Sequence, residues 1–155
     1  MKIILCPNPF RDKGLKAAGE AQRLLTAAGA SCEFCFPFPV EPSHLNTLPS
    51  GIKIKEMKAE LPNADFLVCF GGDGTILHAA KDASSFGVPI IGVNMGSVGF
   101  MAELEQNEIS KLKRLVGGEY AMENRMLLDV KVLREGRALF RSTALNDAVI
   151  TKGAV

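Results

Sequence analysis

The chain has 155 residues, of which 47% are hydrophobic and 23% charged, and its formal net charge is +1. This composition fits one ordinary globular domain with the start of a second, and it gives no support for a nucleic-acid-binding patch. No apolar run is long enough to span a membrane, so a membrane partner is not expected either.

The N-terminal part of the chain predicts a strand, a helix and a second strand. The run KIILC at residues 2–6 is a short buried strand. Apolar residues then recur at helical spacing from Asp12 to Ala28, and Gly29 ends the helix. The run ASCEFCF at residues 30–36 predicts the next strand.

The middle of the chain begins with a segment that lacks periodicity. Residues 37–51 carry four prolines and are expected to form a surface loop. IKEMKAEL, residues 54–61, predicts a short helix that Pro62 stops. The run DFLVCF at residues 65–70 is continuously apolar, as expected of a strand in a parallel sheet that helices cover on both faces.

Two further helices and a strand continue this alternation. A helix is predicted from Thr75 to Ser84, a buried strand over VPIIGVN at 88–94, and an amphipathic helix from Glu108 to Val116 that Gly117-Gly118 closes. Strands and helices in this rhythm predict βαβ units. The expected fold class is therefore α/β, an open and mostly parallel Rossmann-like sheet with helices on both faces.

The pattern changes after Asn124. Residues 125–136 and 137–153 read as two strands around the turn-prone Glu135-Gly136, with no helix between them. We therefore expect an α/β nucleotide-binding domain over residues 1–122 and the beginning of a β-rich domain over 123–155.

Four cysteines occur without the spacing of a disulfide framework, which favours a reducing, cytoplasmic location. Cys32 and Cys35 form a C-x-x-C, which can indicate a redox or zinc site. They lie in a predicted strand, where residues three apart point to opposite faces, and no second pair supplies further ligands. We expect ordinary strand cysteines and no protein-built metal site.

The sequence GGDGT follows the predicted strand that ends at Phe70. Gly71 and Gly72 allow backbone amides to approach an anion, and the helix near Thr75 adds its positive N-terminal end. The spelling matches neither a P-loop nor the usual dinucleotide fingerprint. The segment is thus a candidate phosphate loop.

Asp73 is an unusual residue beside a phosphate, and several roles are open. It could hold a metal ion between phosphates, or accept the proton of a hydroxyl that attacks a phosphoryl group. It could equally be a helix cap or turn residue. His78, one turn into the helix, is either a ligand contact or a surface residue.

Three motifs in order resemble those of the NAD kinases. GGDGT is similar to the signature that these enzymes share with diacylglycerol kinases, sphingosine kinases and, in the shorter form GGDG, phosphofructokinases. NMGSVGF, from Asn94 to Phe100, resembles the N-x-G-x-x-G-F segment of NAD kinases, and ALNDAVI, from Ala144 to Ile150, resembles their third motif. The likeness covers nearly the whole chain.

This resemblance implies transfer of a phosphoryl group from ATP, or in some members polyphosphate, to the 2′-hydroxyl of the adenosine ribose of NAD. Asp73 would be the general base, and Mg²⁺ would neutralise the phosphates of the donor. The resemblance assigns Gly74 to packing against the dinucleotide, Phe100 to the adenine side, and Asn146 and Asp147 to the adenosine. The candidate binding residues are therefore Gly71, Gly72, Gly74, Thr75, His78, Asn94, Gly96, Phe100, Asn146 and Asp147.

Simpler interpretations remain for some of these residues. Phe100 could belong to the core, and Asn146-Asp147 could form a turn at a strand end. Because members of the family are longer, we expect this chain to correspond to an N-terminal portion whose own activity is open, and the full-length enzyme to be a homo-oligomer. Alternatives are a lipid kinase of the diacylglycerol type and a nucleotide-binding module without catalysis.

Overall fold

The structure is a computed structural model that describes residues 1–45, 48–96 and 99–151. It divides into two compact units, Met1–Tyr120 and Ala121–Val155, which are described separately. Within the described ranges, no helix is long and apolar enough to cross a membrane.

The first unit is built on a parallel sheet, as the alternating pattern predicts. Its strands are β1 (Lys2–Pro7), β2 (Ser31–Cys35), β3 (Ile54–Lys55), β4 (Phe66–Gly71), β5 (Ile90–Asn94) and β6 (Leu104–Glu105). They lie in the order β3-β2-β1-β4-β5-β6, and neighbouring strands pair in parallel. The chain moves from β1 toward one edge and from β4 toward the other, so the order reverses between β1 and β4. Open α/β sheets bind ligands at such a reversal, beyond the carboxyl ends of the strands.

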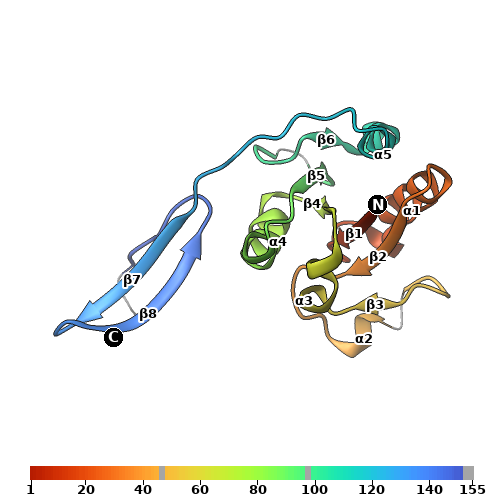
Figure 1. Cartoon of the computed structure of the whole chain (residues 1–155). Helices are drawn as coiled ribbons and strands as arrows, with labels where there is room; N and C mark the ends of the chain where they lie inside the picture. Colours follow the sequence, from red (N-terminus) through yellow and green to blue (C-terminus); the bar gives the residue numbers. More distant parts are fainter. Residues whose placement is uncertain (46–47, 97–98, 152–155) are drawn as a thin grey trace. The chain divides into compact units, whose positions relative to one another are not determined.

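Helices cover both faces of this sheet, which confirms the expected fold class. The crossover through α1 (Lys16–Ala27) leads from β1 to β2, and that through α4 (Asp73–Phe86) leads from β4 to β5. Because the two crossovers run in opposite directions, the same handedness puts their helices on opposite faces. Figure 1 shows α1 and α5 (Lys113–Val116) on one side of the sheet and α4 on the other.

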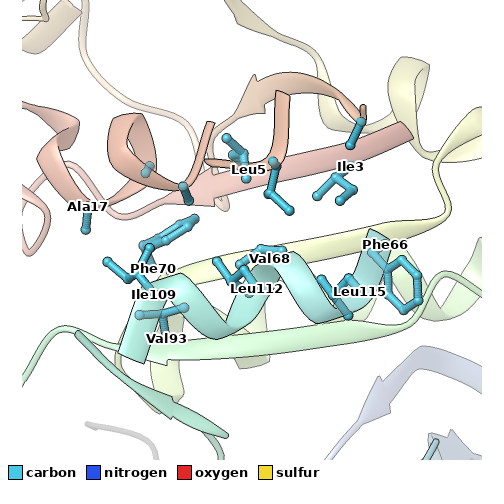
Figure 2. Packing of buried hydrophobic residues seen from close by; sticks show 14 of the residues in the cluster. Ile3, Leu5, Ala17, Phe66, Val68, Phe70, Val93, Ile109, Leu112 and Leu115 are labelled. Atoms are coloured by element: carbon cyan, nitrogen blue, oxygen red, sulfur yellow. The ribbon is translucent and has the colours of Figure 1, made fainter. Parts of the chain in front are cut away.

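The main hydrophobic core lies between the sheet and the helical face that includes α1. Phe70 and Val68 of β4 are fully buried there, together with Ile109 and Leu112 (Figure 2). Alternate residues of β4 reach the two faces, so a continuously apolar strand is buried on both sides. This burial fixes the end of β4, and with it the start of the glycine loop.

Helix α1 begins later than the sequence pattern predicts. The expected helix starts at Asp12, whereas the structure has a 3₁₀ turn at Lys13–Leu15 and an α-helix only from Lys16. Gly14 and Leu15 both have positive φ, 66° and 50°, which interrupts the helix. Asp12 is only 1% exposed, and its carboxylate accepts the amides of Ala17 and Ala18 at 2.9 Å each.

Asp12 therefore ties the start of α1 to the loop after β1, and its loss should be costly. We expect Asp12→Ala to lower the free energy of unfolding by about 2 kcal/mol, because two buried amides lose their acceptors. Denaturant unfolding followed by circular dichroism measures this. Glu20→Ala, at an exposed position of the same helix, should stay within about 0.5 kcal/mol of the parent. Equal effects of the two variants would contradict this role.

Two segments in the middle of the chain also differ from the prediction. The expected helix at 54–61 starts as β3, becomes helical only in α3 (Met57–Glu60), and runs on into a 3₁₀ turn at Leu61–Asn63 that contains Pro62. The expected loop 37–51 contains a single helical turn, α2 (Pro42–Leu45), and its residues 46–47 lie outside the described ranges.

The predicted helix from Glu108 to Val116 is largely a 3₁₀ helix, Gln106–Leu112, that continues into α5. Its apolar residues Ile109, Leu112 and Leu115 are buried as expected. Their burial was predictable from spacing, because positions three apart share a face in both helix types.

The second unit contains the expected hairpin. Strands β7 (Leu128–Arg134) and β8 (Arg137–Ala144) pair antiparallel around Glu135-Gly136, both of which have positive φ. Strand β8 ends well before the predicted limit at 153, of which residues 152–153 lie outside the described ranges. The ALNDAVI motif therefore begins at the last residue of β8 and continues outside any regular element.

All four cysteines lie in strands of the parallel sheet. Within the described ranges Cys6, Cys32, Cys35 and Cys69 are all free. Burial raises the pKa of the Cys32 thiol and, with the carboxylates of Glu60 and Glu33, raises the pKa of Cys35 to about 12. Thiols in this state stay protonated near neutral pH, whereas redox and metal-binding cysteines need the thiolate.

Candidate functional site

The glycine loop follows β4 at the point where the strand order reverses. Gly71 ends the strand, Gly72 is extended (φ −107°, ψ −170°), and α4 starts at Asp73, earlier than the predicted Thr75. A Cβ on Gly71 would lie 2.1 Å from Oγ1 of Thr75, so only glycine lets the first turn of α4 pack this closely on β4. The N-terminal amides of α4 thus lie at the carboxyl edge of the sheet.

Thr75 connects this turn to the loop after β1. Its side chain is 2% exposed, and its Oγ1 accepts a hydrogen bond of 3.2 Å from Nδ2 of Asn8. The backbone amide of Asn8 in turn donates to the carbonyl of Phe70. Hydrogen bonds therefore join the loop after β1 to the loop after β4. Thr75, which was predicted as a binding residue, is buried here and holds the two loops together.

The carboxylate of Asp73 binds the second glycine loop, the segment after β5 that carries the NMGSVGF motif. Its Oδ2 accepts the amide of Phe100 at 3.2 Å and its Oδ1 accepts the amide of Met101 at 3.1 Å. Asp73 is the first residue of α4, and among the described residues no side-chain hydrogen bond caps this helix. The side chain thus reaches across the carboxyl edge of the sheet from the loop after β4 to the loop after β5.

Gly99 belongs to the same contact. A Cβ at this position would lie 3.3 Å from Oδ1 of Asp73 and 3.6 Å from the amide group of Asn94. A side chain here would contact Asn94 normally but would press on the carboxylate of Asp73, which would have to shift slightly. The glycine therefore allows the loop to approach the carboxylate.

Asn94 holds the start of this second loop. It is only 4% exposed, its Oδ1 accepts the amide of Gly96 at 3.0 Å, and its Nδ2 lies 3.2 Å from both carboxylate oxygens of Glu105. The carboxylate of Glu103 accepts the amide of Gly92 at 2.6 Å and so connects the segment before β6 to β5. Asn94 and Gly96 were predicted as binding residues, and here they shape the loop. Residues 97–98 of the loop lie outside the described ranges.

Phe100 is not a core residue. Its side chain is 89% exposed, although its backbone amide is held by Asp73. The alternative that Phe100 belongs to the core is therefore wrong, and its ring is accessible to a ligand.

His78 is exposed on α4 and contacts the proline-rich segment. Its ring meets that of Phe38 edge to face, with 5.6 Å between centroids. Phe38 also stacks on Phe10, which in turn contacts His44. Neither Phe10 nor Phe38 was predicted from the sequence, because isolated aromatic residues in loops carry no periodic signal.

Asn146 and Asp147 lie in the second unit, beyond the end of β8, and both are exposed. Gly71, Gly72, Asp73, Thr75, Asn94, Gly96 and Phe100 are brought together in the first unit, on the loops after β4 and β5. Asn8, Glu103 and Glu105 also belong to this network and were missed. A possible signal for Asn8 was its place directly after the first buried strand.

The described residues build no metal cage of their own. Among residues 1–45, 48–96 and 99–151, no group of three or more histidine, cysteine, aspartate or glutamate side chains could hold a metal ion. A magnesium ion needs few protein ligands when substrate phosphates supply the others. The residues present therefore do not define a resident metal site.

The parallel sheet carries one glycine loop where its strand order reverses, at the start of α4, and a second after the neighbouring strand β5. This arrangement defines an α/β domain that binds ligands at its carboxyl edge. Residues 4–120 match the ATP-NAD kinase N-terminal domain. The chain belongs to the NAD kinase family.

Individual relatives agree with this assignment. The chain is 30% identical to the NAD kinase of Ruminiclostridium cellulolyticum and 34% identical to that of Caldanaerobacter subterraneus, over 99% of its own length and 52% of theirs. Over 58% of the chain it is 45% identical to the NAD kinase of Aromatoleum aromaticum, covering 30% of that protein. The chain thus spans about half the length of the curated relatives it matches most fully.

A solved structure supports the fold. Yeast NADH kinase complexed with NADH superimposes with a TM-score of 0.65 at 19% sequence identity, over 94% of this chain and 47% of that one. At this identity the likeness concerns the fold, and it agrees with the α/β class expected from the sequence.

Proposed function

We propose that the protein transfers a phosphoryl group from ATP or polyphosphate to the 2′-hydroxyl of the adenosine ribose of NAD, which gives NADP. The observation that carries the proposal is the position of Asp73. Its carboxylate stands at the start of α4 and is oriented by the amides of Phe100 and Met101. The reaction is proposed from membership of the family. The geometry supports it because the Asp73 carboxylate can act as the proton acceptor.

The mechanism uses positioning and charge. The amide hydrogen bonds occupy one acceptor site on each oxygen of Asp73, and a carboxylate has about four such sites. The remaining sites can accept the hydroxyl proton as the sugar oxygen attacks the terminal phosphorus of the donor, whose bridging P–O bond breaks and releases ADP or the shortened polyphosphate. The N-terminus of α4 favours the negative charge of the transferred group. Mg²⁺, if used, would arrive with the donor phosphates.

The contacts to the acceptor are part of the proposal. Phe100 would stack on the adenine side, and Asn146 and Asp147 would bind the adenosine, as the motif resemblance implies. An asparagine amide can both donate to and accept from the edge of adenine. The exposure of all three side chains is compatible with these roles. Residues 123–155 would begin a β-rich second domain, and the full-length enzyme would be a homo-oligomer.

The free cysteines are compatible with a reducing, cytoplasmic location, which we propose as well. The site network contains no cysteine. Reducing agents should therefore leave nucleotide binding unchanged.

The direct test is NADP formation from NAD and ATP-Mg by the protein that carries this sequence, followed with an NADP-specific dehydrogenase. Parallel reactions with NADH and with polyphosphate define the acceptor and the donor. Phosphorylation of diacylglycerol instead of NAD would favour the lipid-kinase alternative. Nucleotide binding by calorimetry without any product would favour a non-catalytic module.

Gly74 offers a prediction that separates binding from folding. An added Cβ meets nothing within 4 Å, and the residue is exposed in the first turn of α4. Gly74→Ala should therefore raise the free energy of unfolding by up to about 1 kcal/mol. If the dinucleotide packs against this backbone, the same change should weaken NAD binding about tenfold, measured by calorimetry. Unchanged NAD affinity would remove Gly74 from the binding surface.

A further inference from the structure

Four aromatic side chains from separate segments meet at the carboxyl edge of the sheet. They are Phe10 after β1, Phe38 after β2, His44 in α2 and His78 in α4, and we call them the aromatic cluster. Phe10 and Phe38 are nearly parallel, with an interplanar angle of 11° and centroids 6.2 Å apart. His44 meets Phe10 edge to face at 5.1 Å, and His78 meets Phe38 at 5.6 Å.

Hydrogen bonds connect one side of the aromatic cluster to the first turn of α4, which follows the glycine loop. Asn8 accepts the amide of Phe10 at 3.0 Å and donates to Oγ1 of Thr75 at 3.2 Å. On the other side, His78 lies four residues after Gly74, and helical side chains lean toward the N-terminus. His78 thus lies one turn along the same face of α4 as Gly74, whose own surface is open.

The rings are not buried by their mutual contacts. Phe10 remains 53% exposed, His44 and His78 are exposed as well, and Phe38 is half-buried. Aromatic surface gathered in this way commonly marks a binding site. A flat heteroaromatic base stacks on such rings without requiring particular hydrogen bonds. Arg11 and Lys13 follow Phe10 in the same loop and are exposed, which adds cations suited to phosphate.

The strand order indicates which nucleotide the aromatic cluster would bind. Phe100, proposed for the adenine of NAD, lies on the loop after β5, on one side of the loop after β4 that carries Asp73. Phe10 and Phe38 follow β1 and β2, on the other side of it. The acceptor and the donor of a transfer reaction need separate sites that meet at the reacting group.

We propose that the aromatic cluster is the stacking platform for the base of the nucleotide phosphoryl donor, whose phosphates reach the turn at Gly71–Gly74. This inference rests on the proposed function, because it assigns one side of the same site to the donor. It also gives a role to the proline-rich segment, which carries Phe38 and His44.

Inorganic tripolyphosphate provides the sharpest probe, since it has the charge of the ATP phosphates and no base. Calorimetry on the chain should show that Phe38→Leu and Phe10→Leu each weaken ATP binding about tenfold. Tripolyphosphate affinity should change less than about twofold. Phe38→Tyr keeps the ring and should keep the ATP affinity. Phe86→Leu, at the far end of α4 where the side chain is 45% exposed, serves as the matched control.

Several outcomes would overturn the proposal. If tripolyphosphate binding weakens as much as ATP binding, the rings only hold the loops in place. Equal affinity of the unmodified chain for ATP and tripolyphosphate, or no ATP binding at all, would show that the base has no platform. If NADP is formed but Phe38→Leu leaves ATP affinity unchanged, the platform fails and the proposed function stands. If ATP binding depends on Phe38 but no NADP is formed, the stacking platform stands and the proposed function fails.

Discussion

Asp73→Asn is expected to lower kcat for NADP formation by about 10²–10⁴-fold, because the amide cannot accept the proton of the ribose hydroxyl. The structure adds a second consequence. The two carboxylate oxygens each accept one amide, so in the same position an asparagine would present its NH₂ group to the amide of Phe100 or of Met101 and lose that hydrogen bond. The sheet should remain folded, while the loop after β5 loses one of its attachments. Steady-state kinetics at saturating NAD and ATP measure the effect.

The two consequences can be separated with Asn94→Ala. This variant leaves the carboxylate of Asp73 in place but removes the acceptor for Gly96 and the partner of Glu105. We expect it to lower kcat only about tenfold, because the proton-accepting carboxylate is kept. Amide hydrogen exchange at Phe100 and Met101 reports how far each variant loosens the loop. If both variants lower kcat equally at equal loss of protection, Asp73 acts by holding the loop and not as a base.

The parallel sheet was predictable because its strands are dense in apolar residues. Strand β4 is buried along its whole length, and a continuous apolar run between glycine and helix signals is typical of that position. The glycine loop was predictable for a related reason. Strands and helices alternate along the chain, so a glycine-rich segment between the apolar run of β4 and the next helix must be the loop that joins them. The helix boundaries were less predictable: Leu15 adopts a positive φ that its residue type does not indicate.

The internal attachments of the site could not be read from the sequence. Asp73 binds amides 27 and 28 residues away, and the Asn94–Glu105 pair spans 11 residues. Local patterns carry no information about such contacts, because they arise only when the loops after β4 and β5 meet at the edge of the sheet. Strand β6 has two residues, too few for a period-two pattern, so Glu105 at its end was missed.

Gly71→Ala is expected to be the most destabilising single substitution in the glycine loop. The new Cβ would lie 2.1 Å from Oγ1 and 2.7 Å from Cβ of Thr75, and both residues are buried. Neither atom belongs to the flexible end of a long side chain, so the first turn of α4 must shift away from β4. Overpacking of this kind costs about 3 kcal/mol of unfolding free energy. Denaturant unfolding measures the loss.

A double-mutant cycle with Thr75→Gly tests the cause of this loss. If the clash with Thr75 is responsible, Gly71→Ala should cost about 2 kcal/mol less in the Thr75→Gly background, because the opposing Cβ is gone. Additive effects would mean that residue 71 is restricted by something other than Thr75. Gly74→Ala, three positions along the same turn and facing open space, should show no such penalty. The contrast follows from packing. Gly71 must be glycine because the first turn of α4 lies against it, whereas the surface of Gly74 is open, where a ligand can bind.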